Sequence, residues 1–286
     1  MRLDPPPVRT RLSGTTSHVL HSSLLNEPLR IDVSVPLDYD TGTASYPVVY
    51  LLDGNWLFPV VSHLVRPMEL NAELPPLIVV GIGYHLASDL QREEFERIDD
   101  LRFRDLTPTA GAGQWWTAVR GGKALRPGVE PGNASRFLQA IENDVKPLIR
   151  AQYRVDPAQQ TLAGYSLGGL CVLHALFEQP MWFDSYLAAS PALWWDDGVM
   201  LKKAAAFAET QRWCGRTVFV SIGAREEDAE LASFQMVSNL RWLADQLQKQ
   251  CPSLRLKSLV LDGETHASAI APSLLKGLQW SYAANR

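Results

Sequence analysis

The strongest structural signal in the sequence is Gly164-Tyr165-Ser166-Leu167-Gly168-Gly169. It follows a short apolar run, Thr161 to Ala163, and it precedes a helical run, Leu170 to Phe177. A strand, a glycine turn and a helix in this order predict a nucleophile elbow, in which a serine sits at the tip of a tight turn. Only glycine fits two residues before and after that serine without a clash. The alternative interpretation is a helix capped by Ser166, with the glycines allowing close packing.

The composition is that of an ordinary soluble chain. Of the 286 residues, 46% are hydrophobic and 20% are charged. A net charge of −4 does not favour nucleic acid as a partner, and no apolar run approaches the ~20 residues that span a bilayer. The proline-containing start has no apolar core, so we expect no signal peptide and a cytoplasmic protein. Cys171, Cys214 and Cys251 are odd in number and widely spaced, which favours reduced thiols.

Strand-like and helix-like segments alternate from Val48 onward. This alternation predicts a doubly wound, mostly parallel α/β sheet with helices on both faces. Two earlier segments, 18–24 and 29–35, predict an antiparallel pair at the N-terminal edge. The later strands are expected at 48–52, 77–82, 161–163, 185–189, 217–222 and 254–261. The helices are expected at 60–70, 135–153, 170–177, 199–210, 229–250 and 268–282.

The sequence shows no internal repeat and no dividing linker, so we expect a single domain over residues 15–286. Residues 1–14 are expected to form a flexible N-terminal arm, because their prolines prevent a helix. A long connection runs from about 85 to 132 and includes Trp115 and Trp116. Such a connection without clear elements is typical of an active-site loop or lid.

A serine hydroxyl needs a base to become a good nucleophile. In chains with a nucleophile elbow, the order along the sequence is serine, then the acid, then the histidine. Four of the six histidines precede Ser166, and His174 lies more than two turns away on the same predicted helix. His266 follows the last predicted strand, at the sheet edge that the elbow shares. It is therefore the predicted base, and the alternative is a surface loop histidine.

The acid is expected after the predicted strand 217–222, where Glu226, Glu227 and Asp228 follow one another. Its role would be to orient the imidazole of His266 and to favour its protonated form. Glu226 is the first candidate and Asp228 is the second. The alternative is that these carboxylates only form an acidic first turn of a helix.

An oxyanion hole needs two backbone donors near the serine. One is expected to be the N–H of Leu167, the residue after the nucleophile. The other is expected from the loop after the strand 48–52, where Gly54 and Asn55 are the candidates. The alternative interpretation is that Asp53-Gly54 forms only a turn.

Five motifs together resemble one branch of the α/β hydrolases, the esterase D-like family typified by bacterial siderophore trilactone esterases. The resemblance extends from about Pro28 to the C-terminus, and it is more distant to feruloyl esterases, S-formylglutathione hydrolase and mycobacterial mycolyltransferases. The motifs are Tyr50-Leu51-Leu52-Asp53-Gly54-Asn55, Arg102-Phe103-Arg104-Asp105-Leu106-Thr107-Pro108, Leu162-Ala163-Gly164-Tyr165-Ser166-Leu167-Gly168-Gly169-Leu170, Ser190-Pro191-Ala192-Leu193-Trp194-Trp195 and Gly263-Glu264-Thr265-His266. The second and fourth motifs are more specific than the elbow.

The resemblance implies an α/β-hydrolase fold and a serine esterase that needs no cofactor and no metal. It implies that Ser166 is the nucleophile, His266 the base and Glu226 the acid. It also implies that the amides of Asn55 and Leu167 form the oxyanion hole. The implied partner is a small-molecule carboxylic ester, such as an aryl or catecholate ester or a macrolactone, cleaved through an acyl-enzyme.

Four further side chains are candidate substrate-binding residues. Arg102 and Arg104 could hold an anionic or catecholate-bearing substrate. Alternatively, they could pair with Asp99, Asp100 and Asp105 and order their loop. Trp194 and Trp195 could form a wall of an aromatic pocket, or they could pack in the core beneath it. Two alternative functions stay open at this point. One is an acyltransferase that uses the same serine and histidine, and the other is a non-catalytic binding protein with the same fold.

Overall fold

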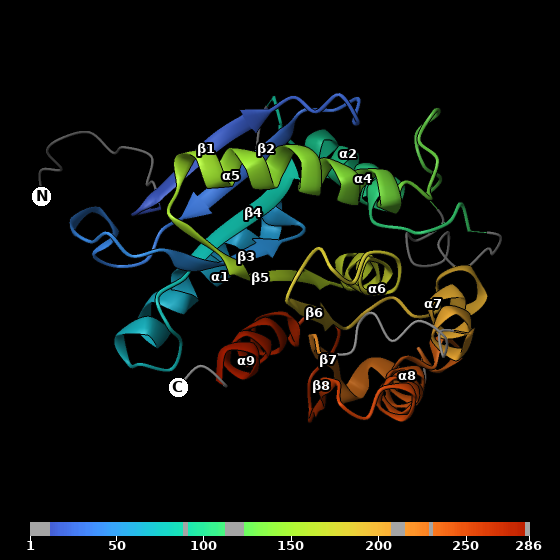
Figure 1. Cartoon of the computed structure of the whole chain (residues 1–286). Coiled ribbons are helices and arrows are strands. Elements are labelled where there is room, and N and C mark those ends of the chain that lie inside the picture. The colour runs from blue at the N-terminus through green and yellow to red at the C-terminus, as the bar shows by residue number, and fades with distance from the viewer. Residues whose placement is uncertain (1–11, 88–90, 112–122, 207–214, 229–230, 284–286) are drawn as a thin grey trace, which may run out of the picture.

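The computed structural model describes residues 12–87, 91–111, 123–206, 215–228 and 231–283, which are built around one β-sheet (Figure 1). Within these residues, eight strands pair in the order β1-β2-β4-β3-β5-β6-β7-β8. β2 is antiparallel to both β1 and β4, and all other neighbours are parallel. This topology confirms the predicted sheet with its antiparallel N-terminal edge. The strands are β1 (Thr15–Leu20), β2 (Leu29–Ser34), β3 (Tyr46–Leu51), β4 (Ile78–Tyr84), β5 (Val155–Tyr165), β6 (Ser185–Ala189), β7 (Thr217–Gly223) and β8 (Arg255–Leu261).

Helices cover both faces of the sheet, as predicted (Figure 1). One hydrophobic cluster joins the sheet to α1 and α9, and a larger cluster joins its other face to α4, α5, α6 and α8. The central strands are therefore buried on both sides, which explains their continuous apolar runs. The helices are α1 (Gly54–Leu70), α2 (Arg92–Asp105), α4 (Ala134–Ala140), α5 (Lys146–Gln152), α6 (Leu167–Glu178), α7 (Trp195–Ala206), α8 (Met236–Gln250) and α9 (Ile270–Tyr282). Shorter helical turns are Tyr39–Thr41, Ile141–Val145, Ala224–Glu227 and Ala232–Phe234.

Helix α1 begins earlier than the sequence pattern predicted. It starts at Gly54 instead of residue 60, directly after the turn that ends β3. Pro59 removes one hydrogen bond from its interior. Leu57 and Phe58 are buried against the sheet, however, and this burial keeps the first turns helical. The early start places Gly54 and Asn55 in the first turn of a helix.

Helix α8 begins later than predicted, at Met236 instead of residue 229. Leu231, which the helical pattern placed on the inner side, is 37% exposed. The carboxylate of Glu227 accepts hydrogen bonds from the N–H and the hydroxyl of Ser238, at 2.7 and 2.6 Å. A carboxylate on the first N–H groups stabilises a helix start, which explains the boundary.

The connection between about 85 and 132 contains a helix, α2, that the sequence analysis did not predict. The charged residues hide its pattern, but Ile98 and Leu101 are buried at helical spacing. Residues 112–122, with Trp115 and Trp116, lie outside the described residues, and the proposed lid stays a prediction there. Most of the predicted arm, residues 1–11, lies outside them as well. We propose that residues 15–286 form a single domain, because one sheet runs from β1 to β8.

The cysteines correct one expectation from the sequence. Cys171 is free and buried in α6. Cys251, at the end of α8, is disulfide-bonded and is therefore not the reduced thiol that was expected. Cys214 lies outside the described residues. None of the described helices combines the length and the apolar character that crossing a membrane requires.

Candidate active site

Ser166 lies in the turn between β5 and α6, where the sequence predicted an elbow. Its backbone angles are φ 59° and ψ −116°, a conformation that residues other than glycine rarely adopt. A side chain at Gly164 would bring its Cβ within 2.5 Å of the backbone of Gly168. This close approach is the physical reason for a glycine before the turn. The turn leaves Ser166 partly exposed at the carboxyl end of β5.

Ser166, His266 and Glu226 meet at the carboxyl edge of the sheet. The Oγ atom of Ser166 is 3.2 Å from Nε2 of His266, and Nδ1 of His266 is 2.5 Å from Oε2 of Glu226. The three residues follow β5, β8 and β7, parallel strands of one sheet whose carboxyl ends lie at the same edge. The His266 side chain is 43% exposed, and that of Glu226 is 1% exposed. A nucleophile, a base and an orienting acid require this order of contacts.

The second candidate acid lies away from the histidine. The side chain of Asp228 is 55% exposed and pairs with Arg225 at 3.0 Å. Glu227 binds Ser238 at the start of α8. Among these three consecutive carboxylates, the structure brings Glu226 into contact with His266.

The environment of Glu226 favours its charged form. Its Oε1 atom accepts hydrogen bonds from the hydroxyl of Ser190 at 2.7 Å and from the N–H of Gly223 at 2.8 Å. Burial raises the pKa of Glu226, but the hydrogen bond and the charge of His266, together with these two donors, outweigh burial and leave the pKa below its usual value. Ser190 had no predicted role. Its position directly after the buried strand β6 is the signal that could have identified it.

Tyr165 supports His266 from the residue before the nucleophile. Its hydroxyl donates a hydrogen bond of 2.5 Å to the backbone oxygen of His266, and the two rings lie 5.1 Å apart. This contact fixes the loop that carries His266 to the end of β5. This contact was not predicted from the sequence, because the tyrosine and the histidine are separated by 101 residues.

The two predicted oxyanion donors belong to the first turns of helices α1 and α6. The first N–H groups of a helix have no partner within it and are available to a ligand. Asn55 and Leu167 follow β3 and β5, which are neighbours in the sheet. The side chain of Asn55 is held by Tyr84, which donates its N–H to Oδ1 at 2.7 Å and accepts from Nδ2 at 2.9 Å. This clamp fixes Asn55 to the end of β4.

Arg102 and Arg104 point to different parts of the molecule. Arg102 pairs with Asp53, with 2.5 Å between Nε and Oδ1. Arg104 forms two bonds of 2.8 Å with the buried carboxylate of Asp105. Both contacts favour pairing with aspartates over substrate binding. Asp105 is a predicted partner, whereas Asp53 was not predicted.

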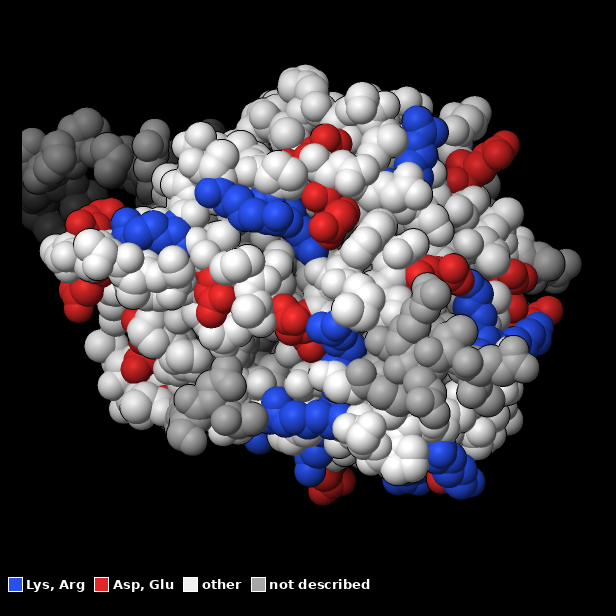
Figure 2. Space-filling view, viewed as in Figure 1, with Lys and Arg blue, Asp and Glu red and all other residues white. Residues whose placement is uncertain are grey.

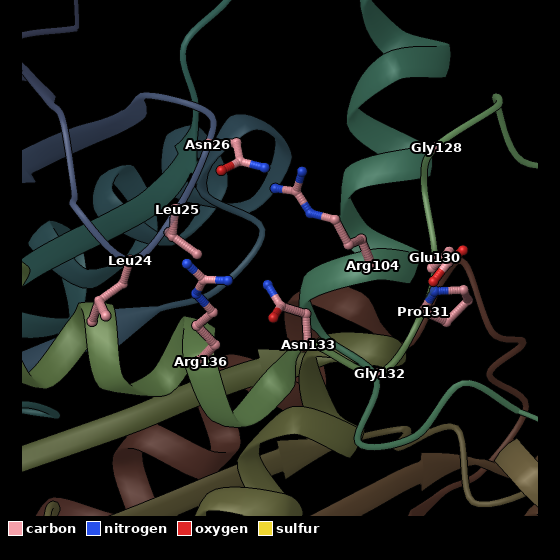
Figure 3. Close-up of a pocket in the computed structure, with 10 residues that line it drawn as sticks. All are labelled: Leu24, Leu25, Asn26, Arg104, Gly128, Glu130, Pro131, Gly132, Asn133 and Arg136. Atoms are coloured by element: carbon pink, nitrogen blue, oxygen red, sulfur yellow. The ribbon is translucent and has the colours of Figure 1, made fainter.

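Arg104 also lines a pocket of about 310 Å³ between the loop after β1, the end of α2 and the start of α4. Figure 3 shows the ends of Arg104, Arg136 and Asn26 directed toward this space. Ser166, His266 and Glu226 do not line it. The pocket is therefore separate from the group of residues around Ser166.

The two tryptophans after β6 have different environments. Trp195 is 1% exposed, packs 5.9 Å from the ring of Phe103 and donates its N–H to Thr109 at 3.1 Å. Trp194 is partly buried, with its ring 5.5 Å from that of Phe234. These contacts favour core packing for Trp195 and leave Trp194 as the candidate for a pocket wall.

His174, which lies too far along its helix from Ser166 to be the base, is packed in the core. It is 3% exposed on α6, and its Nε2 atom is 2.8 Å from the hydroxyl of Ser135. Burial lowers the pKa of His174 from 6.5 to about 4. The imidazole is therefore neutral in the folded protein at neutral pH.

The low pKa predicts that His174 makes the protein less stable in mild acid. Because the folded pKa lies below the unfolded value, the stabilising effect is complete above pH 6.5 and is lost as the pH falls toward 4. Between about pH 7 and about pH 5, we expect His174→Gln to remove roughly 2 kcal/mol of this acid-induced loss. Urea unfolding of both proteins at about pH 7 and about pH 5 measures it. Equal pH dependence in the two proteins would contradict the prediction.

On the face shown in Figure 2, basic and acidic side chains are interspersed. Within the part of the chain that the structure describes, no three His, Cys, Asp or Glu side chains gather as a metal ion would require.

Comparisons with known proteins find similar esterases. A family model described as "Putative esterase" matches residues 105–260. Siderophore triacetylfusarinine C esterase of Aspergillus fumigatus is 34% identical over 280 residues, covering 88% of this chain and 88% of that protein. Ferri-bacillibactin esterase BesA of Bacillus subtilis is 30% identical over 282 residues, covering 94% and 90%. The solved structure of siderophore hydrolase EstA from Aspergillus nidulans has a TM-score of 0.80 and 25% identity, covering all of both chains.

Proposed function

The chain belongs to the esterase family of α/β hydrolases that includes siderophore esterases, and we propose that it is a serine esterase acting through an acyl-enzyme. The observation that carries this proposal is the hydrogen-bonded series from Glu226 through His266 to Ser166. A neutral serine hydroxyl needs such a base to attack a carbonyl carbon. The esterase activity belongs to the family, and the residue roles below are our proposal.

In the first half of the reaction, Ser166 attacks the ester carbonyl while Nε2 of His266 takes the hydroxyl proton. Glu226 holds Nδ1 and stabilises the imidazolium that forms. The carbonyl oxygen becomes an oxyanion, which the N–H groups of Leu167 and Asn55 stabilise. The tetrahedral intermediate then collapses, and His266 gives its proton to the leaving alcohol. Ser166 is left esterified to the acyl group.

In the second half, water attacks the acyl-enzyme. His266 takes a proton from the water, and the same two amides stabilise the second oxyanion. Collapse of this intermediate breaks the bond to Ser166, releases the carboxylic acid and returns the proton to the serine. No step in this scheme uses a cofactor or a metal ion.

We propose that the substrate is an ester bond of a siderophore, because two relatives carry names of siderophore esterases. Trp194 is our candidate for a wall against an aryl or other flat group, since it is only partly buried beside Phe234. Arg102, Arg104 and Trp195 have structural partners, and we propose that none of the three binds substrate. A cytoplasmic location stays a prediction from the sequence, which cell fractionation would test.

A panel of esters tests this proposal by comparing kcat/KM. The panel contains a short p-nitrophenyl ester, a feruloyl ester, triacetylfusarinine C and the bacillibactin trilactone. We expect at least one siderophore ester to exceed the p-nitrophenyl ester by about 100-fold or more, because remote contacts contribute to transition-state binding. Equal rates on all four esters would contradict the substrate assignment. Product analysis with an added alcohol separates hydrolysis from acyl transfer.

A further inference from the structure

Asp53 occupies a position between β3 and α1 to which the proposed mechanism gives no role. Its backbone is left-handed, with φ 56° and ψ 37°, directly before Gly54 and Asn55. A residue other than glycine keeps this conformation when its surroundings hold it there. Aspartate often caps a helix, yet this side chain makes no hydrogen bond to the start of α1. The Asp53 carboxylate therefore serves another contact.

That contact is Arg102, which reaches Asp53 from the last turn of α2. The distances are 2.5 Å from Nε to Oδ1 and 3.0 Å from Nη2 to Oδ2. The two side chains are 12% and 3% exposed. The guanidinium also lies 4.6 Å from the ring centre of Trp56 in the first turn of α1. A two-point pair between guanidinium and carboxylate fixes direction as well as distance.

Asp53 also contacts the beginnings of both helices that carry the proposed oxyanion donors. Its backbone oxygen accepts the N–H groups of Trp56 and Leu57, each at 3.0 Å. On the other side, a Cβ built at Gly168 would lie 3.1 Å from Oδ2 of Asp53. The carboxylate therefore lies against the first turn of α6, one residue beyond Leu167.

A second set of contacts connects the same turn to α2. Tyr84 clamps the side chain of Asn55 with two hydrogen bonds. The hydroxyl of Tyr84 lies 3.1 Å from both Oδ2 of Asp105 and the backbone oxygen of Leu101. Helix α2 thus holds the turn after β3 from two directions, through Arg102 and through Tyr84.

We propose that Asp53 and Arg102 are positioning residues for the oxyanion hole, an inference that rests on the proposed serine esterase function. The pair holds the N–H of Asn55 at the distance and direction that suit the oxyanion. Neither side chain touches the reacting atoms. Because an oxyanion donor acts more strongly in the transition state than in the ground state, the pair should control kcat and leave KM unchanged.

The test uses Arg102→Met, Asp53→Asn and the double variant on a short p-nitrophenyl ester. We expect each single change to lower kcat by about 10- to 100-fold, with KM within about 2-fold of the original protein. The kcat of the double variant should be no lower than that of the more impaired single variant, because the two residues act as a unit. The kcat of Arg102→Lys should lie between those of the original protein and Arg102→Met, since an ammonium group keeps the charge but cannot form the two-point pair. The inhibition constant of a trifluoromethyl ketone should rise by the same factor as kcat/KM falls.

Arg97→Met is the matched control, because Arg97 lies on the same helix and pairs with Glu27 and Glu94 away from the turn. Its kcat should not change. A raised KM with unchanged kcat in Arg102→Met would show that Arg102 holds substrate, and this would overturn the inference. Unchanged kinetics in the folded variant would overturn it too. If Arg102→Met does not fold, Arg102→Lys and Asp53→Asn give the same separation of kcat from KM.

Labelling by a fluorophosphonate separates this inference from the function it rests on. If the original protein is not labelled at Ser166, the proposed function fails. If the original protein is labelled while Arg102→Met keeps full kcat, the positioning role alone fails. Thermal unfolding of each variant verifies that lost activity does not reflect lost structure.

Discussion

Ser166→Ala is expected to lower kcat for a short p-nitrophenyl ester by roughly 10⁵- to 10⁶-fold. Alanine removes the atom that forms the acyl-enzyme, so His266 has no hydroxyl proton to accept at 3.2 Å. The amides of Asn55 and Leu167 remain, and they should keep a small rate above that of the uncatalysed reaction. Steady-state kinetics measure the loss. A fluorophosphonate that labels the original protein should leave this variant unlabelled.

The control for this change is Ser17→Ala, which removes an exposed serine hydroxyl from the edge strand β1. Its activity should match that of the original protein. Ser166→Ala should also keep its fold, because the strained backbone at Ser166 is set by the glycine turn and not by the hydroxyl. A folded Ser166→Ala protein with its full rate would end the proposal of a serine mechanism and favour another nucleophile or a contaminating esterase.

The elbow could be predicted from sequence because its determinants are local. A strand, a turn that excludes any Cβ at Gly164 and a following helix are all encoded within a few residues. The position of His266 also followed, since parallel strands in one sheet end at one edge. These arguments need only the order of strands and helices, which hydrophobic patterning supplies.

The parts that could not be predicted depend on contacts between distant residues. Glu226 was predicted as the acid ahead of Asp228, but carboxylates so close together have the same chemistry, and it is the direction of the turn after β7 that brings Glu226 to His266. The partner of Arg102 was missed because Asp53 lies 49 residues earlier in the chain. Helix α8 starts late because Glu227 caps it at Ser238 from the preceding loop. In each case, tertiary structure selects among options that local propensity leaves equal.

Glu226→Gln is expected to lower kcat by roughly 10³- to 10⁴-fold with little change in KM. Glutamine keeps the shape of the side chain, but it has no charge to stabilise the imidazolium of His266. Its amide can also donate to Nδ1, which would hold the proton on Nε2 and prevent that atom from accepting the serine proton. The substitution therefore changes the hydrogen bond of 2.5 Å between Glu226 and His266. Kinetics across the neutral pH range measure the effect.

Asp228→Asn is the matched control, because it neutralises an exposed carboxylate two residues away that pairs only on the surface with Arg225. Its kcat should stay unchanged. A large loss of kcat in Asp228→Asn with none in Glu226→Gln would make Asp228 the acid. The stability of the two variants should also differ in acid. Since the folded pKa of Glu226 is lowered, its contribution is present above pH 4.5 and is lost as the pH falls through the folded value. Glu226→Gln lacks this pH-dependent contribution. If Glu226→Gln instead retains the full rate, Ser190 and Tyr165 remain to hold the loop and the histidine, and the reaction would proceed with a serine and histidine pair alone.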